Sequence, residues 1–151
     1  MIKIGVDFHG VLEDCKDSRT IKLLLYELRN YYFVYIVSGP PMKQLTSELV
    51  ESGYEIGLHF DAIISTVDFI KSKNIDMWQD KKGDWWTDEK TWNASKSMVC
   101  DDYEIDLLID DMECYRDSLK SNVNFYLYKD MERFIYLIAK LIDEKASKNC
   151  K

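Results

Sequence analysis

Short apolar runs alternate with longer amphipathic segments along most of this sequence. The apolar runs are rich in Val, Ile, Phe and Tyr, have the length of buried strands, and cover residues 2–8, 33–39, 60–66, 105–111 and 123–128. Segments with a helical period lie between them and predict helices over residues 18–32, 42–52 and 88–103, from about 112, and over 131–145. The alternation predicts an α/β fold, with helices packed around a parallel sheet of about five strands.

The pattern breaks between about residues 67 and 90, where neither period continues. Within this segment, residues 77–87 read as two short strands joined by a turn that contains glycine. We therefore expect a small β-hairpin insert between the third and fourth strands of one domain that spans residues 1–151. The last residues, 146–151, are expected to form a frayed tail.

Composition narrows the class of protein and of partner. With 46% hydrophobic and 31% charged residues, the chain has the composition of a globular domain. Its 27 acidic and 20 basic residues give a net charge of -7, which argues against a long nucleic acid as partner. No apolar run reaches the roughly 18 to 20 residues of a membrane span, and residues 1–3 lead into a strand pattern. We expect a cytoplasmic protein with no membrane partner.

Cys15 and His59 are expected to be structural. The cysteines are dispersed and form no C-x-x-C pair, which favours reduced thiols over disulfides or a zinc site: Cys15, Cys100, Cys114 and Cys150. Cys15 lies close to the first strand and is either a small core residue, the reading we favour, or a reactive thiol. His59 precedes the third strand and is interpreted as a structural residue rather than a ligand.

Carboxylates follow two of the predicted strands. Asp7 ends the first strand, and Asp110 and Asp111 end the fourth. Because parallel strands deliver their carboxyl ends to one edge of the sheet, we expect the three side chains to converge. Converging carboxylates repel one another unless a cation lies among them, and hard oxygen ligands suit Mg²⁺. Taken alone, each aspartate is better explained as a helix cap or turn residue, but their combination on two strands favours a metal site.

Other residues near the same edge have the chemistry of a phosphate site. Ser38 and Gly39 end the second strand, and Lys96 lies on the helix before the fourth, with Lys90 as an alternative lysine. A hydroxyl, backbone N–H groups and an ammonium would orient and neutralise a phosphoryl group. Gly10 would let the loop after Asp7 turn tightly, so that its backbone N–H groups also face the phosphate.

These motifs together resemble the haloacid dehalogenase-like (HAD) superfamily. The sequence has "DFHGV" where family phosphatases have Asp-x-Asp-Gly-(Thr/Val), a serine in "VSGPP", a lysine before the fourth strand, and "IDD" at its end. The resemblance covers essentially the whole chain in order of elements. It implies a three-layer, Rossmann-like fold and Mg²⁺-dependent hydrolysis of a phosphomonoester through an aspartyl-phosphate.

The resemblance also implies a role for each matching residue. Asp7 corresponds to the nucleophile, Ser38 and Lys96 to the residues that hold the phosphoryl oxygens, and Asp110 with Asp111 to those that anchor Mg²⁺ directly or through water. A carboxylate that attacks phosphorus needs the charge of the incoming dianion cancelled and an in-line approach, which agrees with this assignment.

His9 departs from the family pattern. In family phosphatases an aspartate at this position protonates the leaving group and then activates water, while its backbone carbonyl binds the metal. The carbonyl of His9 can still do so. Imidazole is a competent acid and base, so His9 either replaces the aspartate or leaves a catalytically weak or inactive module that binds a phosphate compound or a protein.

The residues of the insert do not identify the substrate. All four tryptophans, Trp78, Trp85, Trp86 and Trp92, lie in or just after it, together with Lys81 and Lys82. They form either a stacking wall for a nucleotide base or, as we favour, the packing that a small hairpin needs. A small cap implies an open site for a small phosphorylated substrate, and small nucleotidase-like enzymes are the nearest family members.

A receiver-type signalling domain also gathers aspartates and a lysine at strand ends. Its acidic pair belongs on the first strand, however, whereas "IDD" comes late in this sequence. The arrangement therefore favours the HAD-like interpretation over a receiver domain.

Overall fold

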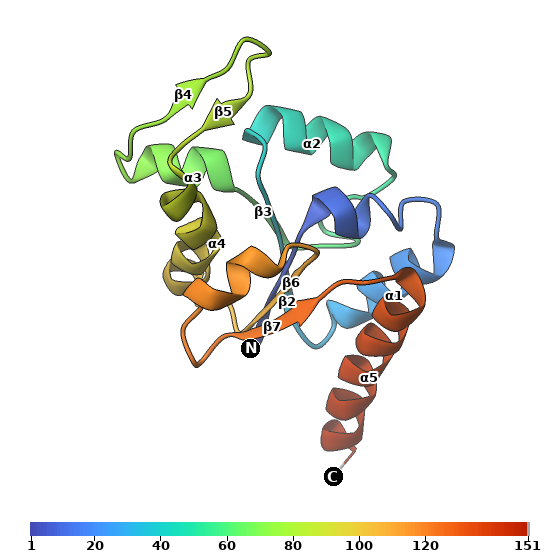
Figure 1. The fold of residues 1–151 in the computed structure, drawn as a ribbon. Coiled ribbons are helices and arrows are strands. Elements are labelled where there is room, and N and C mark those ends of the chain that lie inside the picture. The colour runs from blue at the N-terminus through green and yellow to red at the C-terminus, as the bar shows by residue number, and fades with distance from the viewer. Residues whose placement is uncertain (151) are drawn as a thin grey trace.

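A five-stranded parallel sheet forms the centre of the protein. The computed structural model describes residues 1–150, and its sheet has the order β3-β2-β1-β6-β7 (Figure 1). The strands are β1 (Lys3–Val6), β2 (Phe33–Ser38), β3 (Ala62–Ser65), β6 (Leu107–Asp110) and β7 (Asn124–Leu127). Every neighbouring pair is parallel, which confirms the predicted α/β fold.

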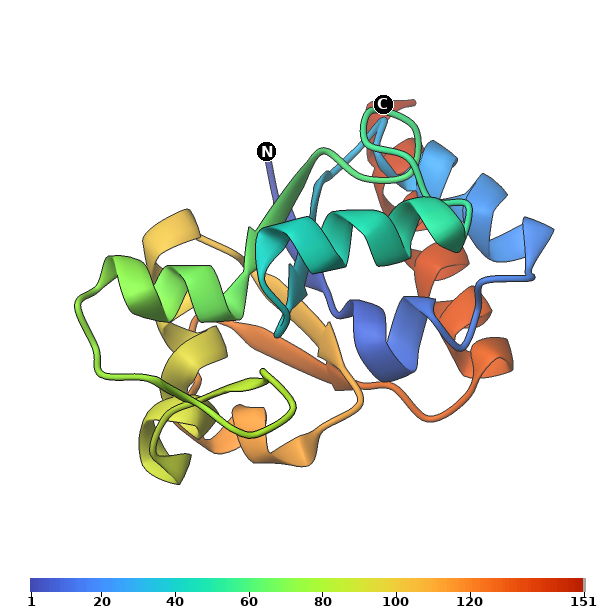
Figure 2. The same ribbon diagram turned by 90° about the horizontal axis from the view of Figure 1, so that it is seen from above.

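Helices cover both faces of the sheet, as the views in Figures 1 and 2 show. The helices are α1 (Arg19–Leu28), α2 (Met42–Glu51), α3 (Thr66–Ser72), α4 (Glu89–Tyr103) and α5 (Met131–Asn149). Buried side chains of α1, α2 and α5 share one apolar cluster with residues of β1 and β2. Buried side chains of α3 and α4 share a second cluster with β3 and β6. The arrangement is the predicted three-layer structure.

Side-chain caps fix where most of the helices begin. Ser18 accepts a hydrogen bond from the backbone N–H of Ile21 at 3.2 Å, so α1 begins where the sequence predicted. Asp88 and Asp130 cap α4 and α5 in the same way. Each cap satisfies a backbone N–H that the first turn of a helix leaves without a partner.

Three predicted elements were wrong in type or extent. Residues 66–72 form helix α3 inside the predicted insert, because Ser65 caps it; at seven residues it is too short to show a period. The helix predicted from about Met112 is a short 3-10 helix, Glu113–Ser118, with only Tyr115 buried. Of the tail predicted to fray, residues 146–149 are helical, because none of them breaks a helix, and Lys151 lies outside the described residues.

The predicted hairpin exists and is organised by one aspartate. It consists of β4 (Trp78–Gln79) and β5 (Trp85–Trp86), which pair antiparallel. Asp80 accepts hydrogen bonds from the backbone N–H groups of Lys82 and Asp84 and from the indole N–H of Trp86, at 2.8, 3.0 and 2.9 Å. These bonds hold the turn without a core of its own, which explains how two such short strands stay paired.

Cys15 and His59, which were predicted to be structural, are buried. The thiol of Cys15 is 1% exposed, and burial raises its pKa, which disfavours the reactive thiolate. His59 is buried, and its Nδ1 accepts a hydrogen bond from the backbone N–H of Glu55 at 2.9 Å. Across residues 1–150, no helix combines the length and the apolar character needed to pass through a bilayer.

Candidate functional site

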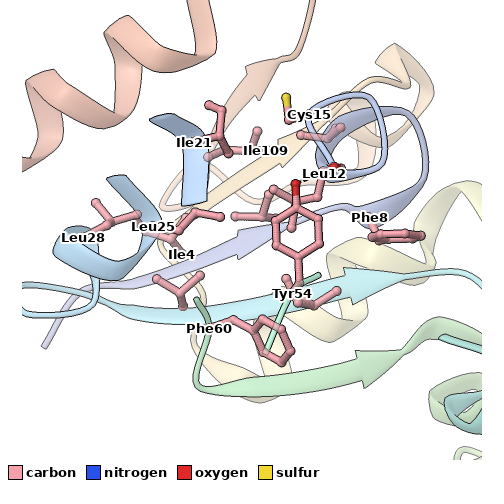
Figure 3. Packing of buried hydrophobic residues seen from close by; sticks show 14 of the residues in the cluster. Ile4, Phe8, Leu12, Cys15, Ile21, Leu25, Leu28, Tyr54, Phe60 and Ile109 are labelled. Carbon is pink, nitrogen blue, oxygen red and sulfur yellow. Dashed lines mark hydrogen bonds between the residues drawn. The ribbon is translucent and has the colours of Figure 1, made fainter. Parts of the chain in front are cut away.

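The segment after β1, Phe8–Leu12, forms a tight turn that the core holds in place, with non-helical backbone at His9 and Gly10. Phe8, Val11 and Leu12 are at most 1% exposed, whereas His9 and Gly10 are exposed. The hydroxyl of Tyr54 donates to the backbone carbonyl of Leu12 at 2.6 Å and points toward this turn in Figure 3. The apolar side chains of the turn therefore pack into the core, and His9 and Gly10 face solvent.

The three predicted carboxylates meet at the carboxyl edge of the sheet. β1 and β6 are neighbours, and the backbone N–H of Asp7 donates to the carbonyl of Ile109 at 2.9 Å, which aligns the two strand ends. One carboxylate oxygen of each of Asp7, Asp110 and Asp111 lies within 4.8 Å of the others. Asp7 and Asp110 are buried, and Asp111 is partly exposed. The predicted convergence is confirmed.

Lys96 lies between two of these carboxylates. Its Nζ is 3.2 Å from Oδ1 of Asp7 and donates to Oδ2 of Asp110. The residue is 2% exposed, and its Nζ lies 4.8 Å from the ring centroid of Tyr115. Lys90 is exposed at the start of α4, so the structure selects Lys96 of the two candidate lysines.

Burial and charge together set the ionisation of the cluster. Burial raises the pKa of Asp7 to about 6, against the opposing effect of Lys96. Burial and the neighbouring charge of Asp110 also raise the pKa of Asp111. Burial disfavours the charge on Lys96, but the two carboxylates outweigh burial and raise its pKa, so the lysine is protonated at neutral pH.

The donor set fits a small divalent cation. Three ionised carboxylates and one ammonium leave two formal negative charges uncompensated at the sheet edge. Asp110 already accepts from Lys96 through Oδ2 and from the backbone N–H of Met112 through Oδ1 at 2.9 Å. Its lone pairs are partly engaged, so Asp7 and Asp111 have more capacity for a direct bond to Mg²⁺.

Ser38 places a hydroxyl group at the same edge of the sheet. It is completely buried at the end of β2. Its Oγ makes no hydrogen bond of 3.5 Å or less among residues 1–150, but it lies near enough to Asp7 to lower the pKa of that carboxyl. Buried hydroxyls normally have a partner, so this one marks a place where a ligand oxygen can bind. Ser38 and Gly39 line a cleft of about 460 Å³ together with Asp7, Lys96 and Asp111, where the sequence placed them.

Gly10 is required by both its backbone and its neighbour. Its φ is +80°, and a Cβ built on it would lie 2.1 Å from Oδ2 of Asp111. The left-handed backbone and the contact with a carboxylate both exclude a larger residue. The glycine of the "DFHGV" motif thus keeps Asp111 close to the turn.

We expect Gly10→Ala to lower the free energy of unfolding by about 1–2 kcal/mol through its backbone and to displace the carboxylate of Asp111 as well. Gly57→Ala is the matched control, because Gly57 has φ +82° and, apart from its own chain neighbours, no described residue within 4 Å of a built Cβ. Urea unfolding and Mg²⁺ titration of both variants check this. Equal Mg²⁺ affinity in the two variants would show that the contact with Asp111 has no effect on the site.

His9 lines the cleft, but its ring contacts a residue that was not part of the predicted site. Nε2 of His9 lies 2.6 Å from Oε2 of Glu48, and the amide of Gln44 donates to the other oxygen of Glu48 at 2.9 Å. Both partners are on α2, which passes alongside the turn Phe8–Leu12 in Figure 2. Sequence reasoning missed Glu48, because a glutamate on an amphipathic helix looks like any solvated residue.

The tryptophans of the insert do not behave as one group. Trp92 lines the cleft, and its indole lies 3.6 Å from a Cβ built on Gly39. Trp85 is partly buried with Nζ of Lys71 3.4 Å from its ring centroid. Trp78 and Trp86 are 54% and 46% exposed, so the favoured packing interpretation is wrong for these two.

The solved structures include one with the same fold. No family model matches this sequence, and no curated protein matches it. The crystal structure of an uncharacterized protein from Corynebacterium glutamicum is similar, with a TM-score of 0.60 and 19% sequence identity. The similarity covers 95% of this chain and 96% of that one, so it extends over nearly the whole fold.

Proposed function

We propose that this protein is an HAD-like, Mg²⁺-dependent phosphatase that hydrolyses a small phosphomonoester through an aspartyl-phosphate. The observation that carries the proposal is the buried arrangement of Asp7, Asp110 and Lys96 beside Asp111, at the edge where the buried hydroxyl of Ser38 lies near Asp7. A nucleophile, a cation site and phosphate-oxygen donors are the parts that phosphoryl transfer needs in one place.

Each residue has a task that follows from its position. The Asp7 carboxylate attacks phosphorus and the bond to the leaving oxygen breaks, giving an aspartyl-phosphate. Water then attacks phosphorus, and the bond to Asp7 breaks. His9 takes the proton that water loses and gives it to the leaving oxygen of the next substrate. Ser38 and Lys96 hold phosphoryl oxygens. Asp7, Asp111 and the carbonyl of His9, with Asp110 directly or through water, would hold Mg²⁺, which would cancel the charge of the phosphoryl group.

The cleft supports a small substrate. It is open and about 460 Å³ in volume, and Trp92 and Tyr115 give it an aromatic wall. Such a wall accepts the base of a nucleotide better than an aliphatic sugar, so a nucleoside monophosphate is the first substrate to assay. The cytoplasmic location stays a prediction.

We expect millimolar Mg²⁺ to stabilise the protein, because three carboxylates are held together in the folded state only. A concentration one hundred times Kd corresponds to about 2.7 kcal/mol of added stability. Thermal unfolding with and without MgCl₂, at matched ionic strength, measures this. Asp111→Asn should no longer be stabilised by Mg²⁺. Asp117→Asn, which changes an exposed residue of the 3-10 helix, should still be stabilised. A response unchanged in Asp111→Asn would contradict the metal site.

Hydrolysis of an aryl phosphate and of a nucleotide panel with Mg²⁺ tests the activity directly. We expect turnover by the wild type. If the wild type hydrolyses nothing while His9→Asp gains activity, the protein is the non-catalytic binding module instead. If neither hydrolyses any phosphomonoester, the phosphatase proposal fails.

A further inference from the structure

We propose that Glu48 is a positioning residue that fixes the tautomer and orientation of His9, so that Nδ1 is the nitrogen that serves the reaction. The inference rests on the proposed function, because it assigns a partner to the acid and base of that site. No residue in the motifs "DFHGV", "VSGPP" or "IDD" supplies this partner, and helix α2 does.

The contact between the two side chains determines where the proton lies. Oε2 of Glu48 is 2.6 Å from Nε2 of His9, which is a short hydrogen bond. An ionised carboxylate only accepts, so Nε2 must carry the hydrogen. In a neutral imidazole the other nitrogen then has the free lone pair, and that nitrogen is Nδ1.

The partner is itself held in place. Gln44 donates to Oε1 of Glu48 from one turn earlier on α2, so each carboxylate oxygen has its own hydrogen bond. Leu45 and Leu49 are at most 1% exposed and lock this helix against the core. The side chain of Glu48 is 28% exposed against 44% for His9, so the carboxylate is the more enclosed member of the pair. A rotamer fixed in this way can orient an imidazole that solvent would otherwise leave mobile.

The other carboxylate beside the ring does not compete for the same role. Oε2 of Glu13 lies 3.9 Å from Nδ1, which is beyond hydrogen-bond distance, and its side chain is 50% exposed. Asp7 and Asp111 line the same cleft as His9. Nδ1 is thus the nitrogen that no hydrogen bond among residues 1–150 occupies.

The spectroscopic test uses side-chain ¹H–¹⁵N NMR, since the protein has only two histidines. At a pH of about 8.5, well above the ordinary imidazole pKa of about 6.5, we expect a slowly exchanging proton on Nε2 of His9 in the wild type. Glu48→Leu should lose this signal, and Glu48→Gln, whose amide oxygen still accepts, should recover it. Glu51→Leu removes the same charge from an exposed position on α2 and should change nothing. His59 is the internal reference, because its Nδ1 accepts from a backbone N–H.

The kinetic test uses an aryl phosphate with Mg²⁺. We expect Glu48→Leu to lower kcat about 10- to 100-fold with KM nearly unchanged, and Glu48→Gln to restore much of kcat. An unchanged kcat in Glu48→Leu, or an Nε2 proton signal that is absent in the wild type or survives in Glu48→Leu, overturns the inference. The NMR result does not need turnover, so an inactive wild type with the expected signals contradicts the phosphatase proposal and leaves the His9–Glu48 pairing established.

Discussion

Asp7→Asn is expected to reduce hydrolysis of an aryl phosphate by at least about a thousandfold, because an amide oxygen cannot replace the attacking carboxylate. The variant keeps the shape of the buried side chain and an oxygen near Lys96, so the fold should persist. Steady-state kinetics with saturating Mg²⁺ measures the loss, and circular dichroism confirms that the variant is folded. A burst of phosphate-labelled protein in the wild type, absent in Asp7→Asn, would locate the intermediate on this residue.

The matched control is Asp143→Asn, which makes the same chemical change at an exposed position of α5. Its activity should equal that of the wild type. Substantial activity in Asp7→Asn would remove Asp7 from the nucleophile role, and the carboxylate cluster would then act only as a metal site.

Lys96→Met is expected to lower the free energy of unfolding by about 3–5 kcal/mol at neutral pH. The ammonium is buried between Asp7 and Asp110, and its removal leaves two carboxylates in a low-dielectric setting with no cation. Methionine keeps most of the volume of the lysine stem, so the loss of stability reflects the missing charge more than a loss of packing. Urea unfolding measures the change. Lys90→Met, at an exposed position of the same helix, is the control and should have little effect.

The loss in Lys96→Met should shrink as the pH falls. The pKa of Asp7 is about 6 in the folded protein and 3.8 in the unfolded reference, so the folded state binds more protons between these values. Stability from this group therefore increases as the pH is lowered through 6 toward 3.8. Without Lys96 the folded pKa of Asp7 rises further, and acidification restores more stability to the variant than to the wild type. An equal deficit at pH values of about 5 and 7.5 would show that packing, not charge, is lost.

The strands and the long helices follow from the sequence because their signals are local and repeated. The run from Phe33 to Gly39 has no polar residue before Ser38, and Ser18 stands where a cap is needed. Helix α3 has a cap in Ser65 but no repeated apolar period, since four of its seven residues are buried, Thr66 among them, and the segment is too short to define a face. Tertiary packing decides the structure there, and a single sequence does not reveal it.

The strand-end residues were predictable for a different reason. Parallel topology alone brings Asp7, Asp110 and Ser38 to one edge, so the site followed once the strands were assigned. The partner of His9 was not predictable, because the reach of Glu48 across to the turn depends on side-chain rotamers and on how α2 lies over the sheet. Likewise, the sequence left Lys90 and Lys96 as alternatives, and only burial separates them.

The lysine between the two strand-end carboxylates has a consequence for how the protein responds to its surroundings. Lys96 provides a permanent counter-ion inside the fold, so the acidic edge assembles during folding without waiting for an ion from solution. Folding and metal loading are then separate events, in contrast to small domains that are unfolded without their metal. On the proposed function, a fall in Mg²⁺ would leave a pool of folded, idle protein that regains activity as soon as the ion returns.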